Sequence, residues 1–291
     1  MDNETLMVGG YRVVREIERD GLGVVYEAEH PLTRRRVSVR SIGREVARDV
    51  SFSRRFLLEV HGYEALEHEA IPRLYELAYD DGTPYLVTEL VGGRTLAEVL
   101  EGGKRLAPRN VLGLLRPIAD ALDYAHARST VHRDVRSAHI LLADDGRTML
   151  TGFGMGTVAA VSTPVNAGGQ RMAPDHVAPE RLVGRDIDGR ADVYSLAAVI
   201  FEAITGRAPF SSVSWIETLS RRLYEPPPNA CDVLLDLPPA FGEVLKAAMD
   251  RDPARRPTTA GEMFEQLTAA LKEASGKKGH RKASNGRSEA S

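Results

Sequence analysis

A short polar run, His132-Arg133-Asp134, supplies residue types for acid–base chemistry near the middle of the chain. The Asp134 carboxylate can accept a proton from a hydroxyl group if a loop holds it toward a substrate. A second run, Gly152-Phe153-Gly154, follows and contains no side chain able to bind a metal ion or move a proton. The sequence therefore offers one candidate base beside a glycine-rich segment.

The hydrophobic pattern predicts the elements that must position these residues. Alternating residues predict strands at 11–17, 23–30, 36–42, 74–79 and 85–90, with one helix at 52–67 between them and a hairpin turn at Asp81-Gly82. Two short strands are expected around residues 144–146, and residues 152–177 read as a loop. Helical spacing recurs at 95–100, 108–128, 188–205, 214–224, 240–249 and 260–274.

Bulk composition is that of an ordinary soluble globular protein, with 43% apolar and 27% charged residues. A net charge of −3 does not favour nucleic-acid binding. The single cysteine, Cys231, excludes a disulfide framework within the chain. We expect no secretory signal, no membrane span and a cytoplasmic location.

Other short signals stand in a fixed order around the two runs. They are a glycine-containing turn at 18–25, Arg40, Glu59, then Ala178-Pro179-Glu180, the run from Asp192 to Ser195, and Arg256. Each signal alone is weak, whereas the ordered set is typical of one scaffold. From about residue 11 to residue 271 the chain resembles the Ser/Thr protein kinase family, of the type common in bacteria.

The resemblance implies an α+β, two-lobed protein-kinase-like fold. We expect an N-terminal extension at 1–10, a small β-rich N-lobe at 11–91 and a larger, mainly helical C-lobe at 92–274. Residues 275–291 are polar and basic, and we expect a disordered tail there.

Kinases hold the ATP phosphates on a glycine-rich turn and with a strand lysine. In this sequence Glu18 and Asp20 occupy the first two glycine positions, and only Gly23 and Val25 remain of the pattern. Two carboxylates would repel a polyphosphate, although they can also be read as solvated acids on a turn. The turn is therefore a poor phosphate site on either reading.

Arg40 stands where the family has the strand lysine, and Glu59 matches the acid on the following helix. Because a planar guanidinium does not replace an ammonium between two phosphates, we expect an Arg40–Glu59 ion pair that clamps the helix to the sheet. Two further positions match residues that sandwich adenine, Val25 and Leu141. Thr88 marks the back of that pocket, and Glu89 and Val91 lie at the connection between the lobes.

The catalytic loop keeps Asp134 but has Arg136 in place of a lysine that steadies the transferred phosphate. Of the two metal-binding residues that the resemblance implies, His139 replaces an asparagine and Gly152 replaces an aspartate. A neutral imidazole is a poor ligand for the hard Mg²⁺ ion. We therefore expect no metal site.

Scaffold positions, by contrast, match the family. The resemblance implies a Glu180–Arg256 ion pair, an Asp192 carboxylate that caps the catalytic loop, and an apolar column of Tyr63, His132 and Phe153. In the substrate-docking segment Ala173 replaces a threonine and His176 a tyrosine.

The selective losses predict a pseudokinase that acts as a signalling scaffold or regulatory binding module. One alternative is a weak or atypical ATP-dependent Ser/Thr kinase that uses Asp134 and Arg136. The other is a sensor that binds ATP without Mg²⁺. Expected partners are other signalling proteins, including an active kinase or a phosphopeptide-binding domain. Candidate phosphorylation sites are Thr157, Ser162, Thr163 and Ser284, which follows the basic pair Arg281-Lys282.

Overall fold

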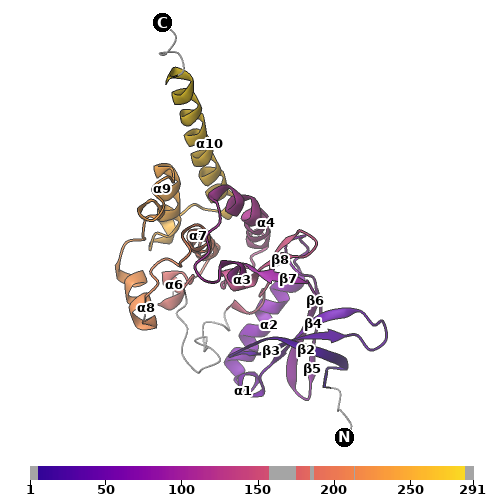
Figure 1. The fold of residues 1–291 in the computed structure, drawn as a ribbon. Coiled ribbons are helices and arrows are strands. Elements are labelled where there is room, and N and C mark those ends of the chain that lie inside the picture. Colours follow the sequence, from indigo (N-terminus) through magenta and orange to yellow (C-terminus); the bar gives the residue numbers. More distant parts are fainter. Residues whose placement is uncertain (1–5, 157–174, 184–186, 213, 286–291) are drawn as a thin grey trace.

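Alternating apolar residues in the first part of the chain form a twisted antiparallel sheet in the computed structural model, which describes residues 6–156, 175–183, 187–212 and 214–285. The strand order is β1-β2-β3-β4-β6-β5 (Figure 1). Their bounds are β1 Met7–Val8, β2 Tyr11–Asp20, β3 Gly23–Glu29, β4 Arg36–Ile42, β5 Leu74–Asp80 and β6 Thr83–Glu89.

The register of this sheet places three residues of the candidate site in one row. Glu18 on β2 lies opposite Val25 on β3, which lies opposite Arg40 on β4. The tight turn between β2 and β3 requires a glycine, because Gly23 has φ +152° and a Cβ there would lie 2.0 Å from the Ser41 carbonyl oxygen. Charges of opposite sign therefore lie two strands apart beside the turn.

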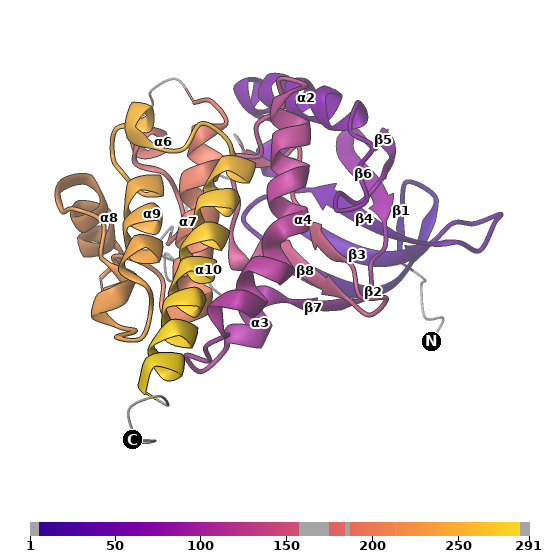
Figure 2. The ribbon, with the colours of Figure 1, turned by 90° about the horizontal axis from the view of Figure 1, so that it is seen from above.

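Two helices, α1 (Arg44–Ala47) and α2 (Val50–Glu64), follow β4. The Asp49 carboxylate caps α2 by accepting hydrogen bonds from the backbone amides of Ser51 and Phe52. One face of α2 is buried in the protein, and its apolar members are Phe52, Phe56, Val60 and Tyr63. This packing fixes the position of α2, which carries Glu59 and lies beside the C-lobe (Figure 2).

The C-lobe starts with a three-stranded sheet, β7 (Gly93–Thr95), β8 (Ile140–Ala143) and β9 (Thr148–Leu150). Helix α7 runs through its core, and nearly all of its residues are buried. Helix α7 (Arg190–Thr205) packs against α4 (Pro108–His126), α9 (Pro239–Ala248) and α10 (Ala260–Asn285). The remaining helices of this lobe are α3 Leu96–Leu100, α6 Pro179–Leu182 and α8 Trp215–Tyr224. Short 3₁₀ turns lie at Ser137–His139, Ala230–Asp232 and Pro253–Arg255.

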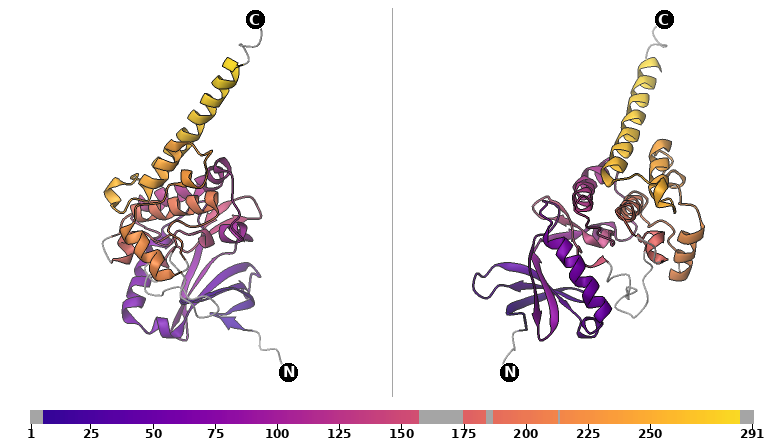
Figure 3. Two further views of the ribbon diagram at one scale, coloured as in Figure 1. Left: turned by 60° about the vertical axis from the view of Figure 1, so that its left-hand side comes forward. Right: turned by 180° about the vertical axis from the view of Figure 1, so that it is seen from behind.

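The two-lobed α+β prediction is confirmed, and the β8–β9 hairpin lies where two short strands were expected. Strand β1 and helix α1 were not predicted. Helix α10 continues to Asn285, into the segment expected to be disordered, and projects away from the C-lobe (Figure 3). Extending a helix that is already formed needs no new nucleation, even through Gly276 and Gly279, and the compositional argument overlooked this.

In the part of the chain that the structure describes, every helix is too short or too polar to cross a membrane.

Candidate functional site

A buried carboxylate at the start of α7 holds the catalytic loop. Asp192 has no exposed surface and accepts hydrogen bonds from the backbone amides of His132 (2.8 Å) and Arg133 (2.7 Å). The His126 Nε2 group donates to the same carboxylate at 2.8 Å. Burial acts to raise the pKa of Asp192, but these hydrogen bonds and the His126 charge lower it overall. The cap predicted for Asp192 is therefore present, and it is anionic.

The predicted apolar column is also present. The His132 ring lies edge-on to Phe153 with centroids 4.5 Å apart, and the Tyr63 ring centroid lies 5.8 Å from that of Phe153. His132 Nε2 donates to the Thr151 carbonyl at 2.9 Å, which orients the ring. Burial lowers the pKa of His132, so the ring stays neutral and packs as an apolar group.

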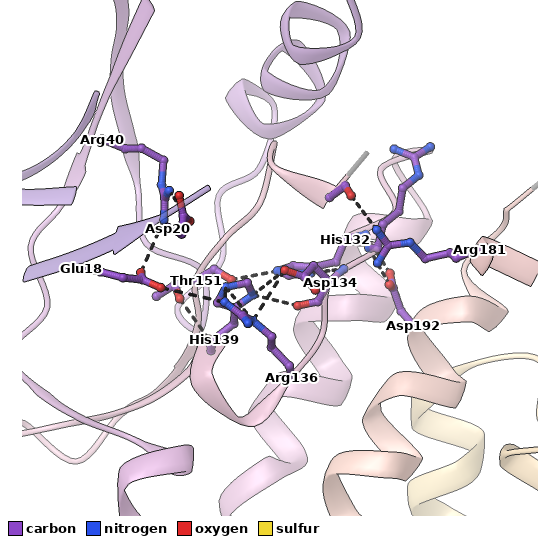
Figure 4. A network of polar contacts seen from close by, with 12 residues as sticks. Glu18, Asp20, Arg40, His132, Asp134, Arg136, His139, Thr151, Arg181 and Asp192 are labelled. Atoms are coloured by element: carbon purple, nitrogen blue, oxygen red, sulfur yellow. Dashed lines mark hydrogen bonds and ion pairs between the residues drawn. The ribbon is translucent and has the colours of Figure 1, made fainter. Parts of the chain in front are cut away.

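Asp134 lies at the centre of a polar network (Figure 4). Its carboxylate is 3.4 Å from His139 Nδ1 and 3.7 Å from Arg136 Nε. Burial acts to raise the pKa of Asp134, yet its basic neighbours, including Arg136 and Arg181, lower it overall. The group is therefore ionised at neutral pH, as a general base must be.

His139 fills the position of a metal-binding asparagine, and both of its ring nitrogens are in use. Nδ1 donates to the Asp134 carbonyl oxygen at 2.8 Å, while Nε2 accepts from Arg136 Nη2 at 3.0 Å. Burial and the Arg136 charge lower the pKa of His139 to about 3, so the ring is neutral. Neither nitrogen has a lone pair left for a metal ion.

Gly152 makes room for this ring. A Cβ at residue 152 would lie 3.1 Å from His139 Nδ1 and 3.3 Å from Cε1, and the φ of +92° favours glycine. An aspartate at 152 would therefore need the imidazole to move. The two departures from the metal-binding pattern are sterically coupled, which their sequence separation did not indicate.

The two acids of the turn have arginine neighbours, although the Glu18 side chain stays 43% exposed. Asp20 Oδ1 accepts from the amides of Leu22 (2.9 Å) and Gly23 (3.0 Å), and Oδ2 accepts from Arg40 Nη1 at 2.8 Å. Glu18 lies 3.5 Å from Arg40 and 3.9 Å from Arg136 (Figure 4). One carboxylate thus occupies turn amides, and the other joins the two arginines that stand in place of lysines.

The expected Arg40–Glu59 ion pair is wrong. Arg40 pairs with Asp20 at 2.8 Å and lies 3.5 Å from Glu18, whereas Glu59 accepts from Arg133 Nη1 at 2.7 Å. The two acids on β2 lie in the same sheet as Arg40, and they take its guanidinium group in place of Glu59 on the helix. The result is an ion pair between α2 of the N-lobe and the catalytic loop of the C-lobe.

The positions predicted to hold adenine come from both lobes. Val25 is nearly buried on β3, Thr88 lies on β6 opposite Ser38, and Leu141 lies on β8. The Glu89 carboxylate accepts from Arg147 Nη2 at 3.0 Å, and Val91 follows β6. Whether these residues hold a nucleotide stays a prediction.

Away from this site, the Glu180–Arg256 pair is formed as predicted. Its two hydrogen bonds measure 2.6 and 2.8 Å, and both side chains are buried. His176 contacts Glu202 at 2.9 Å. The positions Ala173, Thr157, Ser162 and Thr163 lie outside the described residues.

The comparisons with known proteins agree with the geometry. The family model described as "Protein kinase domain" matches residues 11–269. The chain belongs to the protein kinase family. As a protein kinase homologue it is 32% identical to Ser/Thr-protein kinase PknJ of Mycobacterium tuberculosis, over 90% of this chain and 45% of the relative. It is 34% identical to PknA of the same species, over 90% of this chain and 61% of the relative.

Among solved structures, the PknI kinase domain of M. tuberculosis matches with a TM-score of 0.75 and 27% identity, over 92% of this chain and 98% of that chain. This kinase-family chain spans about half the length of the curated relatives named above.

The residues at the two metal positions of this kinase fold do not fit Mg²⁺. Gly152 offers no side-chain oxygen, and the nitrogens of His139 are both hydrogen-bonded. Mg²⁺ requires oxygen ligands in a near-ideal octahedron.

Sequence reasoning missed Arg181, which follows Glu180 on α6. Its Nη2 group donates to the Gly156 carbonyl at 2.8 Å, and burial lowers its pKa. Only its place in the Ala-Pro-Glu segment could have pointed to it. The Glu18–Arg40 contact had a clearer signal, since pairing the two hairpins puts both residues in one row.

Proposed function

We propose that this chain is a pseudokinase, a kinase-fold module that binds signalling partners and does not transfer phosphate. The observation that carries the proposal is the position of its own carboxylates. Asp20 takes two amides of the glycine turn, and Glu18 lies beside both Arg40 and Arg136. The groups that would attract a polyphosphate are thereby satisfied within the chain.

A nucleotide triphosphate entering this site would have to displace both acids. It would exchange charge-assisted hydrogen bonds already made, such as Asp20–Arg40 at 2.8 Å, for equivalent ones. It would also leave two carboxylates near its own negative charge. Little net binding free energy remains for the phosphates.

Phosphoryl transfer rests on positioning and on neutralising the charge of the transferred group. Neither His139 nor Gly152 supports a metal ion that would do this. Loss of one preorganised electrostatic group typically costs about 10²–10³ in rate. The ordered catalytic loop then serves as scaffold.

The partners we propose are other signalling proteins, namely an active kinase or a phosphopeptide-binding domain, met in the cytoplasm. Support comes from the family and from the basic run before Ser284, the kind of sequence that basophilic kinases modify. A phosphate there would add about −1.5 to −2 charges and create a docking site.

One observation favours the alternative of a weak kinase. Asp134 is ionised and held by a capped loop, so the base itself is ready. A second observation keeps open metal-independent nucleotide sensing. Thr88 and Leu141, at the adenine positions, are only partly buried.

The deciding experiment is transfer of radiolabelled phosphate from ATP to the chain and to a basic protein substrate, with Mg²⁺ and with Mn²⁺. The proposal expects no signal above the Asp134→Ala variant. Transfer that Asp134→Ala abolishes would establish the weak kinase. A thermal-shift titration with ATP and EDTA tests the sensor, for which a saturable shift is required.

A further inference from the structure

The outer face of α2 exposes large apolar side chains. Val50 is 81% exposed, Leu58 68% and Leu57 41%, although the same helix buries Phe52, Phe56 and Val60 on its inner face. Residues seven and eight apart lie on one side of a helix. The three residues therefore lie on one face of the helix, over about 11 Å at 1.5 Å per residue. Arg54 lies on the same face, four residues from Val50 and four from Leu58. We call the three apolar residues the α2 stripe.

Positive charge lies within and beside the α2 stripe. Arg54 and Arg55 are exposed between Val50 and Leu57, and Arg48 precedes the helix. Within the described ranges no carboxylate pairs with these three guanidinium groups, whereas Arg44 nearby is paired with Asp81. Asp49 is already engaged as the helix cap. The surface thus combines an apolar seam with uncompensated positive charge.

We infer that the α2 stripe docks an acidic amphipathic helix of a partner protein. Val50, Arg54 and Leu58 are spaced four apart, as in a ridge that one helix packs against another, and Leu57 lies beside this ridge. Glutamates beside the partner's apolar residues would pair with Arg54 and Arg55. A basic or uncharged helix would bury the leucines but leave the arginines unpaired.

The support beneath the stripe is rigid, which favours docking. The inner face of α2 is packed, its N-terminus is capped by Asp49, and Glu59 pairs with Arg133 of the C-lobe at 2.7 Å. A partner would therefore not have to order the helix that it binds.

The test uses the whole chain and a fluorescent synthetic peptide of about 20 residues, long enough to form a helix. Leucines are spaced three and four apart, glutamates flank them and alanines fill the other face. A second peptide has lysines in place of the glutamates. Fluorescence anisotropy is expected to show saturable binding of the glutamate peptide, weakened about tenfold or more by Leu58→Glu. The double variant Arg54→Glu/Arg55→Glu should prefer the lysine peptide.

The matched control is Leu235→Glu, because Leu235 is 91% exposed and lies in the C-lobe. It should bind the glutamate peptide as the unmodified chain does. Circular dichroism checks that each variant folds. Three results would overturn the inference: equal binding of both peptides, equal loss in Leu58→Glu and Leu235→Glu, or no binding by the folded chain. Self-association of the chain that Leu58→Glu abolishes would instead assign the stripe to a second copy.

Discussion

Two groups of ion pairs, one in the C-lobe core and one beside the β2–β3 turn, use charge in different ways. Glu180 and Arg256 are buried and joined by two short hydrogen bonds, as the family pattern implies. Beside the turn, Glu18, Asp20 and Arg40 of the N-lobe and Arg136 of the catalytic loop all depart from the pattern and lie close to one another. The first group joins elements of the C-lobe core. Under the proposed function, the second group removes an attraction for phosphate, so the fold and the phosphate site depend on different charges.

The sharpest test of the contrast is Arg256→Ala. Removing one partner of a buried pair leaves Glu180 uncompensated, so we expect a loss of about 3–5 kcal/mol in the free energy of unfolding. Urea denaturation measures it. Arg116→Ala, which breaks the exposed Arg116–Asp120 pair, should cost less than about 1 kcal/mol. Similar losses in the two variants would contradict the role given to the buried pair.

A second test concerns the coupled metal positions. Gly152→Asp should destabilise the chain by about 1–3 kcal/mol, because φ is +92° and the new Cβ meets the His139 ring. Adding His139→Asn should recover part of that loss by removing the contact. Only the double variant is expected to gain an Mg²⁺-dependent thermal shift with ATP. A gain in Gly152→Asp alone would show that the positions are independent.

A third test removes the acids of the turn. Glu18→Gly/Asp20→Gly should strengthen metal-free ATP binding by about tenfold, or 1.4 kcal/mol, since turn amides and Arg40 become available. Isothermal titration in EDTA measures the change. Glu16→Gly, on the same strand and paired with Arg19, serves as the control and should leave affinity unchanged. If the double variant binds no better, the carboxylates do not exclude phosphate.

The smallest effect is a pH dependence in the C-lobe. Burial acts to lower the pKa of His126, but its hydrogen bond to Asp192 raises it above 6.5. The folded chain therefore holds this proton more tightly than the unfolded chain. Stability from this source is complete below pH 6.5 and is lost as pH rises through the folded pKa. The difference in the free energy of unfolding between the unmodified chain and His126→Gln should shrink from pH 6 to pH 9. A difference that grows over this range would contradict a raised pKa of His126.

Sequence patterns predicted the scaffold well, because strand alternation, helix spacing and the Glu180–Arg256 and Asp192 positions depend on local periodicity and ordered motifs. They predicted less about the site. The Arg40 partner depended on which acid lies nearest in three dimensions, and the His139–Gly152 contact depended on ring placement. The length of α10 was underestimated because composition alone says little about a helix already nucleated by packing.

The ion pairs that join the lobes have a consequence for motion. Glu59–Arg133, Glu18–Arg136 and Glu89–Arg147 all connect groups near or across the junction. An enzyme that releases product through this junction must swing open in each cycle, commonly on the microsecond-to-millisecond timescale. In this chain each swing would break several charged contacts at once. These contacts favour a single arrangement of the two lobes, so a binding partner would meet the same surface each time.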